Sequence, residues 1–114
     1  MSNPILDRAR LHFRADERRA ITVPEWGADG APLVLYALPV TLADKKKLHN
    51  RYKDGGLQEM YVHALIDKAQ TEGGSPAFTL EDKRSLMTAV DPRVVERIAA
   101  QILDAPDMEA VEKN

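Results

Sequence analysis

Apolar residues recur with helical spacing through most of the second half of this chain. Over 57–70 they cover more than one side of the expected helix, which indicates a helix in the core. A shorter helix is predicted from Leu80 to about Ala89. A last helix follows Asp91 and Pro92, an aspartate cap and a first-turn proline. The apolar residues of this last helix cover well over half of its circumference: Val94, Val95, Ile98, Ala99, Ile102 and Leu103.

The first half of the chain predicts a short helix and a β-hairpin. Apolar residues at helical spacing among arginines indicate a helix from about Pro4 to Ala15. Residues 21–26 form an extended segment, and residues 33–38 are typical of a mostly buried strand. Asp29-Gly30 between them readily takes positive φ, which favours a tight turn. Because two strands alone are marginally stable in water, the hairpin should dock on helices or on another copy.

Two glycine pairs divide the central helical region. A helix should begin at Thr41, where the hydroxyl can cap the first turn, and run to about Lys53. Asp54-Gly55-Gly56 should stop it. Its face is mostly polar, and the residues expected to face inward are Leu42, Leu48 and Tyr52. The core helix should then extend over 57–70 and end at Gly73-Gly74.

Together these elements predict an α+β fold that is mainly α, with one N-terminal β-hairpin packed on about four helices. We expect a partly helical N-terminal segment over 1–20, a single domain over 21–104 and an acidic mobile tail over 105–114. A chain of 114 residues is long enough for one modest core.

Composition narrows the class of protein. The chain has no cysteine, so it can form neither disulfides nor thiolate metal sites, which fits the cytoplasm. The first residues lack a basic segment followed by an apolar run, so no signal peptide is expected. The apolar run 32–40 is far shorter than the roughly 20 residues of a membrane helix. We therefore expect a soluble intracellular protein that does not engage a membrane.

Charge is divided along the chain. Residues 1–53 hold ten Lys and Arg against six Asp and Glu, whereas residues 54–114 hold six against twelve. This division could steer a charged partner or favour head-to-tail association into a homo-oligomer. The alternative is a solvated surface on which the charges mix in space.

No pattern of residues predicts catalysis or a bound cofactor. His12, His49 and His63 lie on different predicted elements, so we interpret them as surface histidines rather than zinc ligands. Most carboxylates lie at expected helix caps or ends, and the two Gly-Gly pairs lack the context of a phosphate-binding loop. We therefore expect no catalytic residue, no cofactor and no metal, and hence no enzyme.

Two basic clusters raise the question of nucleic-acid binding. They comprise Arg8, Arg10, Arg14, Arg18 and Arg19 near the N-terminus, and Lys45, Lys46, Lys47, Arg51 and Lys53 in the helix after Thr41. Acidic residues interrupt both clusters, whereas a nucleic-acid footprint needs one strongly basic face. Solvated faces are therefore favoured, and a small nucleic-acid-binding regulator is the weaker alternative.

The last helix predicts a protein-binding site. Its apolar coverage is wide enough for part of it to face a protein partner, and the candidate residues are Val94, Ile98 and Ile102. The alternative is a core helix, covered by the hairpin on one side and by the 57–70 helix on the other.

Residues 21–27 resemble the V-P-E-W-G motif of phage tail assembly chaperones, a family of tailed bacteriophages and prophages. In that family a strand leading into an apolar-Thr helix start, and then a long apolar helix, follow in the order found here. The family helix often ends in Asp, an acidic-Gly turn and F-T-x-x-D. The matching residues are Asp67, Glu72-Gly73, Phe78-Thr79 and Asp82. Residues 74–77 depart from the family, which more often has a basic residue near the turn.

The resemblance, which spans roughly 21–104, implies a non-enzymatic protein of the host cytoplasm that assists phage tail assembly. Such proteins keep the tape measure protein soluble, recruit tail tube subunits and are absent from the finished virion. The implied partners are therefore the tape measure protein and the tail tube protein, with no nucleic acid. A structural phage component, such as a head–tail connector or a minor tail protein, is the alternative.

Overall fold

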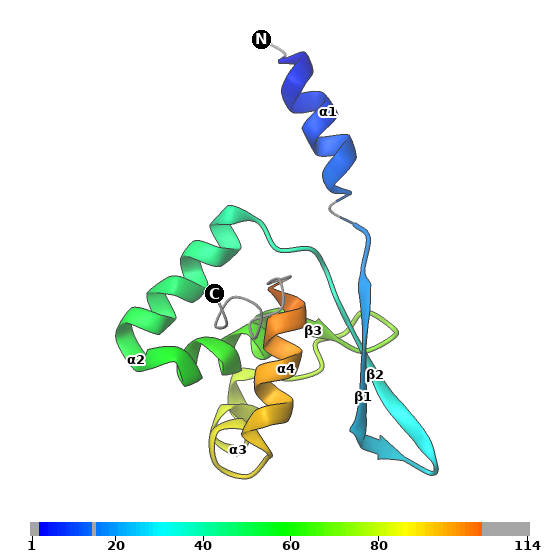
Figure 1. Ribbon diagram of the computed structural model, residues 1–114, viewed down its shortest axis with the longest axis vertical. Coiled ribbons are helices and arrows are strands. Elements are labelled where there is room, and N and C mark those ends of the chain that lie inside the picture. Colours follow the sequence, from blue (N-terminus) through cyan, green and yellow to red (C-terminus); the bar gives the residue numbers. More distant parts are fainter. Residues whose placement is uncertain (1–2, 15, 104–114) are drawn as a thin grey trace, which may run out of the picture.

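The computed structural model describes residues 3–14 and 16–103. They form an α+β fold that is mainly α, as the sequence predicts (Figure 1). In chain order the elements are α1 (Pro4–Phe13), β1 (Arg19–Ala28), β2 (Ala31–Ala37), α2 (Leu42–Lys68), β3 (Ala69–Gln70), the 3₁₀ turn η1 (Leu80–Asp82), α3 (Lys83–Thr88) and α4 (Pro92–Ile102). The tail expected over 105–114 lies outside the described residues.

The predicted hairpin is present and gains a third strand. Asp29 and Gly30 take φ values of 54° and 77° at the turn, so the chain reverses between Ala28 and Ala31, which pair with each other. The sheet in the described part of the chain is antiparallel, with the order β1-β2-β3. The register of β1 is irregular after Val23. β1 lies at one edge of this sheet, where a strand tolerates the proline that β1 contains.

The core helix ends two residues earlier than predicted. The sequence predicts that it continues to Gln70 and stops at Gly73-Gly74. Instead, Ala69 and Gln70 pair with the end of β2 as strand β3, and the Ala77 N–H donates to the carbonyl of Ala69 at 2.9 Å. Ala69 is only 2% exposed, and the same burial would suit either a helix or a strand. The apolar pattern therefore could not distinguish the two.

α2 bends sharply at Gly56. Its start is capped as predicted, because the Thr41 side chain accepts from the Asp44 N–H at 3.1 Å and the Asp44 carboxylate accepts from the Thr41 N–H at 3.0 Å. Gly56 has φ 89° and ψ −178°, a region open essentially to glycine alone. The predicted stop at Asp54-Gly55-Gly56 is thus a bend, and the helix resumes at once. The bend at Gly56 divides α2 into a first limb (42–55) and a second limb (57–68).

Fewer side chains of the first limb are buried than the sequence predicts. Leu48 is 2% exposed, as expected, but Leu42 and Tyr52 are 86% and 46% exposed. Their predicted inward orientation is therefore wrong. The bend at Gly56 carries the first limb away from the sheet (Figure 1), so most of its side chains meet solvent.

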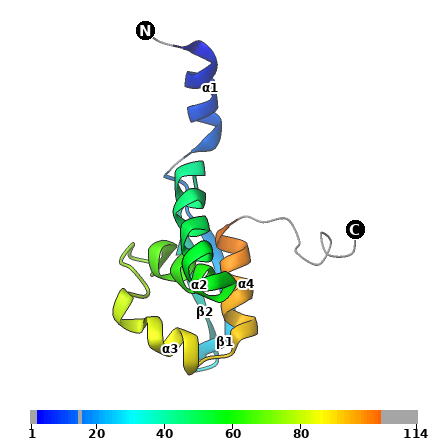
Figure 2. The same cartoon turned by 90° about the vertical axis from the view of Figure 1, so that its left-hand side faces the viewer.

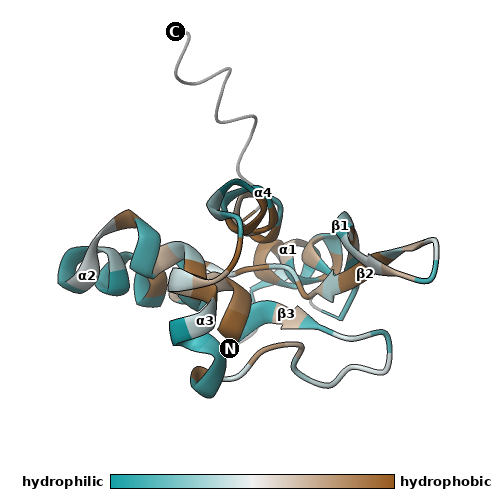
Figure 3. Cartoon of the chain, turned by 90° about the horizontal axis from the view of Figure 1, so that it is seen from below, coloured by the Kyte–Doolittle hydropathy of each residue, from teal (hydrophilic) through white to brown (hydrophobic). Residues whose placement is uncertain are grey.

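α4 closes the core against the sheet and the second limb of α2. Asp91 caps it by accepting from the Arg93 N–H at 2.9 Å. The helix predicted over 80–89 is divided into η1 and α3, and Asp82 accepts from the Thr79 N–H at its start. The apolar face of α4 points inward and its polar face points outward (Figure 3). The buried cluster comprises Ile21, Val23, Leu35, Ala37, Leu48, Tyr61, Val62, Ala64, Leu65, Ala69, Leu86, Val94, Val95, Ile98, Ala99 and Ile102.

α1 stands apart from this core. Asn3 caps the helix by accepting from the N–H groups of Ile5 and Leu6 at 3.0 and 3.3 Å, and Arg14 ends it in the left-handed conformation. None of its residues is buried, and two views at right angles show it projecting from the body (Figure 1, Figure 2). The predicted N-terminal helix therefore exists but takes no part in the core.

Leu65 lies in the buried second limb of α2 with 0% exposure. We expect Leu65→Ala to lower the free energy of unfolding by about 2–5 kcal/mol, because it removes buried contacts and leaves a cavity. Leu42→Ala makes the same change at an exposed position of the same helix, and should alter that free energy by less than about 0.5 kcal/mol. Urea unfolding followed by circular dichroism measures both, and equal effects would contradict the burial of Leu65.

Gly56→Ala would force a residue with a side chain into a φ of 89°. We expect it to lower the free energy of unfolding by about 1–3 kcal/mol through backbone strain. Gly73→Ala is the matched control, because the added methyl group would meet no atom within 4 Å. Thermal melts compare the two variants, and a shared midpoint would show that α2 does not bend at Gly56 in solution.

Candidate protein-binding site

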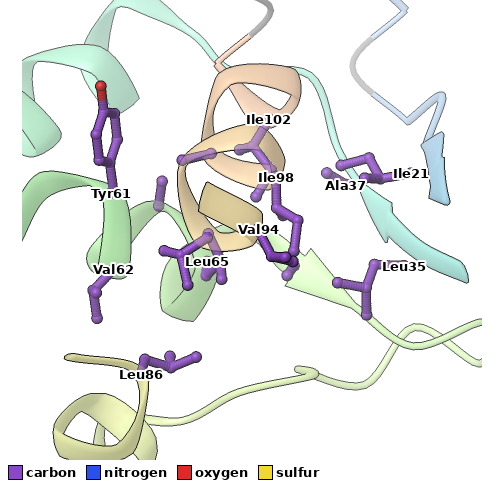
Figure 4. Packing of buried hydrophobic residues seen from close by; sticks show 14 of the residues in the cluster. Ile21, Leu35, Ala37, Tyr61, Val62, Leu65, Leu86, Val94, Ile98 and Ile102 are labelled. Atoms are coloured by element: carbon purple, nitrogen blue, oxygen red, sulfur yellow. The ribbon is translucent and has the colours of Figure 1, made fainter. Parts of the chain in front are cut away.

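The three residues predicted to bind a partner lie in the core. Val94, Ile98 and Ile102 are 3%, 0% and 1% exposed. They lie between Leu65 of α2 and the sheet, which contributes Ile21 (Figure 4). The expectation of an exposed partner face at these residues is therefore corrected. The sheet and α2 cover α4 on both sides. The wide apolar face of α4 is therefore buried within the fold, as the alternative interpretation predicts.

The exposed apolar residues lie mainly on α1 and along α2. The large ones are Ile5, Leu6, Leu11 and Phe13 on α1, Leu42, Tyr52 and Leu57 on α2, and Leu80 and Met87 near α3. On α1, the helical period places Ile5, Leu6 and Phe13 on one side and Leu11 on the other. The spacing of Leu6 and Phe13 is visible in the sequence. Sequence alone does not show, however, that the body leaves this helix uncovered.

A small apolar pocket opens where α2, α3 and α4 meet. Its volume is about 80 Å³, and it is lined by Gln58, Tyr61, Val62, Leu86, Met87, Pro92, Val95 and Glu96. Val62, Leu86 and Val95 are buried, whereas Met87 is 42% exposed. Glu96 adds an exposed carboxylate. The size and lining suit one aliphatic side chain of a partner.

A larger polar cleft lies between the two limbs of α2. Its volume is about 650 Å³, and it is lined by Asp44, Lys47, Leu48, Asn50, Arg51, Asp54, Asp67 and Lys68. Lys68 and Asp44 form an ion pair of 2.8 Å that joins the end of the second limb to the start of the first. Burial raises the pKa of Asp44, but hydrogen bonds from Lys68 and Thr41 hold it below its ordinary value. Asp44 therefore stays charged at neutral pH, and its ion pair with Lys68 links the two limbs on either side of the bend at Gly56.

Part of the N-terminal basic cluster is used by the fold. Arg18 donates to the carbonyl of Thr71 at 3.0 Å and to that of the next residue at 2.9 Å, and it lies 4.7 Å from the ring centre of Tyr36. Arg19 donates to the carbonyl of Gln101 at 2.8 Å. Both arginines thus tie the start of β1 to distant parts of the chain, which leaves them less available to phosphate groups.

His63 is buried, which corrects the prediction of a surface histidine. It is 2% exposed, and no described residue forms a hydrogen bond with its Nε2. The nearby Glu59 Oε1 is 4.0 Å from Nε2 and is paired with Lys83. Burial lowers the pKa of His63, the charges of Arg51 and Lys83 lower it further, and Asp67 and Glu59 oppose this.

The other two histidines, His12 and His49, are exposed. Among the described residues, no three His, Cys, Asp or Glu side chains gather closely enough to hold a metal ion. Within the same residues, no helix has both the length and the apolar character needed to cross a membrane.

The residues of the V-P-E-W-G motif make specific contacts in the fold. Glu25 accepts two hydrogen bonds of 2.6 Å from Arg97 of α4, which lower the pKa of Glu25 to about 2. Trp26 packs edge-on against Phe78, with ring centres 6.3 Å apart. A Cβ at Gly27 would lie 2.1 Å from the carbonyl oxygen of Ala31. The motif therefore joins the hairpin to α4 and to the segment before η1.

The structure is similar to that of the tail assembly chaperone of bacteriophage HK97. The match has a TM-score of 0.58 and 19% sequence identity, and it covers 91% of this chain and 95% of the HK97 chain. At this identity the comparison shows a shared fold. No family model matches the sequence, and no curated protein matches it.

Folding lowers the pKa of His63 below its ordinary value of 6.5, so the unfolded chain binds this proton more readily. The stability linked to His63 is therefore fully present above about pH 6.5 and is lost as the pH falls. We expect the melting temperature of His63→Leu to fall less than that of the unmodified chain between about pH 7.5 and pH 5. His49→Leu, at an exposed position, should follow the unmodified chain. Identical pH profiles for all three proteins would rule out a buried, uncharged His63.

Proposed function

We propose that this protein is a non-enzymatic chaperone of phage tail assembly, which keeps the tape measure protein soluble in the host cytoplasm. The observation that carries the proposal is the fold shared with the HK97 tail assembly chaperone over 91% of this chain. The V-P-E-W-G resemblance supports it, because Glu25 and Trp26 of that motif contact α4 and the segment before η1.

A chaperone of this kind needs apolar surface that is accessible before its partner arrives. A long partner rich in apolar helices would otherwise self-associate. Reversible contact with the apolar surface of a chaperone prevents this, because each Å² of apolar surface buried contributes about 25 cal/mol of binding free energy. Leu42, Tyr52 and Leu57 expose such surface along α2. The exposed lysines at 45–47 lie on the same limb as Leu42 and Tyr52 and keep the chain itself soluble. We place the partner contact along α2 rather than on the buried stripe of α4.

Co-expression with the tape measure protein of the same phage or prophage tests this function. We expect the tape measure protein to move from the insoluble to the soluble fraction and to co-purify with this chain. An unrelated long coiled-coil protein, expressed in the same way, should gain no solubility. Leu42→Ser changes an 86% exposed side chain, so it should preserve the fold and reduce co-purification. A tape measure protein that stays insoluble would refute the proposal.

Purified phage particles separate the chaperone from the structural alternative. A chaperone should be absent from the virion, because it leaves once the tail has assembled. A connector or minor tail protein should be present in fixed stoichiometry with the other tail proteins. Quantitative mass spectrometry of virions measures this ratio, and a fixed stoichiometry would overturn the chaperone assignment.

A further inference from the structure

Two hollows meet at Phe13, at the base of α1. The first, of about 360 Å³, lies beside the start of β1. Its lining residues are His12, Phe13, Glu17, Arg18, Arg19 and Pro39. The second, of about 330 Å³, lies beside the start of α2, and its lining residues are Phe13, Val40, Thr41, Leu42 and Lys45. Because Phe13 lines both hollows, we treat them as one surface, the Phe13 groove.

The Phe13 groove combines exposed apolar side chains with a basic rim. Phe13 and Leu42 are 38% and 86% exposed. Arg18, Arg19 and Lys45 line the rim, and these three positive charges exceed the negative charge of the described lining. Such a groove fits a segment that carries both apolar side chains and carboxylates.

Residues 104–114 have this composition. They follow α4 and lie outside the described residues, and we call them the acidic segment. Met108 and Val111 give it two large apolar side chains, and Lys113 is its one basic residue. Its carboxylates are Asp104, Asp107, Glu109 and Glu112. The acidic segment therefore complements the Phe13 groove in charge and in apolar character.

The acidic segment follows directly on a helix that is tied to the groove. Arg19, which lines the groove, donates to the carbonyl of Gln101 in the last turn of α4 at 2.8 Å. Two views at right angles show the end of α4, the base of α1 and the start of α2 towards the same end of the body (Figure 1, Figure 2). Eleven extended residues reach at most about 36 Å. The groove is therefore accessible to the acidic segment of the same chain.

We propose that the acidic segment binds back onto the Phe13 groove of its own chain, with Met108 against Phe13 and Leu42 and the carboxylates beside Lys45. Attachment to α4 gives the segment a high effective concentration at the groove, so weak contacts are enough to keep it bound. This docking is independent of any tail partner. One consequence rests on the proposed function: the segment covers Leu42, which we assign to the partner contact, so it acts as an internal competitor that the partner displaces.

Cross-linking of the full chain tests the docking. The chain has no cysteine, so Met108→Cys combined with Leu42→Cys introduces a single pair of thiols. We expect this pair to form a disulfide within one chain about tenfold faster than Met108→Cys combined with Ala43→Cys, because docking raises the effective concentration at the groove. Ala43 is the matched control, since it is exposed and adjacent to Leu42 but does not line the groove.

Charge reversal tests the basic rim. Lys45→Glu should slow the cross-link between positions 108 and 42, whereas Lys53→Glu, an equal change of charge at an exposed position of the same limb, should not. Circular dichroism checks that each variant keeps its fold. Equal rates for the Leu42 and Ala43 pairs would overturn the docking, and so would equal effects of the two charge reversals. Cross-links of twice the chain mass alone would overturn it as well, because another copy would then occupy the groove.

Co-expression with the tape measure protein tests the competition. Neutralising the segment with Glu109→Gln and Glu112→Gln should increase the amount of tape measure protein captured, because a weaker competitor covers Leu42. Glu96→Gln, at an exposed carboxylate outside the groove, should leave that amount unchanged. Equal capture by all three chains would overturn the competition. A tape measure protein that stays insoluble with every chain would instead refute the proposed function, and the cross-linking result would still decide the docking.

Discussion

The burial of Ile98 between Ile21 of the sheet and Leu65 of α2 is the contact on which the other elements depend. All three side chains are 0% exposed. The sheet is too small to be stable alone, and α4, with eleven residues, is too short. Each element is stable because the other two cover its apolar face, so the sheet, α2 and α4 form one cooperative unit. α1 adds nothing to this contact, and none of its residues is buried.

Ion pairs between elements orient this unit more than they stabilise it. Glu25–Arg97 joins β1 to α4, Asp44–Lys68 joins the two limbs of α2, and Glu59–Lys83 joins α2 to α3. Solvent reaches all three pairs, whose side chains are 20–45% exposed, and ion pairs that water and salt screen contribute little net free energy. Each pair nevertheless links segments far apart in the sequence, so it restricts how the packed elements can slide past one another.

Structural features that depend on neighbouring residues were predictable from the sequence, whereas features that depend on contacts between distant residues were not. The cap at Thr41 and the turn at Asp29-Gly30 depend on residues within a few positions, and both are present. The break at Gly56 was placed correctly, but the helix bends there instead of ending. β3 needs the end of β2, more than thirty residues away, as its partner. The sequence predicts a surface position for His63, yet this side chain is buried. Its burial depends on where the rest of the chain packs, and no local pattern records that.

The same limit explains why the apolar width of α4 did not locate a binding surface. A wide apolar face shows that something covers a helix, but it does not show whether the cover is the same chain or another one. On α4 the cover is internal, because the sheet and α2 flank Ile98 on both sides. On α1 the apolar stripe is narrower, yet in the described part of the chain Ile5 and Leu6 remain 73% and 50% exposed. Intermolecular contact is therefore better sought where apolar residues exceed what the fold can bury, and in this chain that condition is met on α1 rather than on α4.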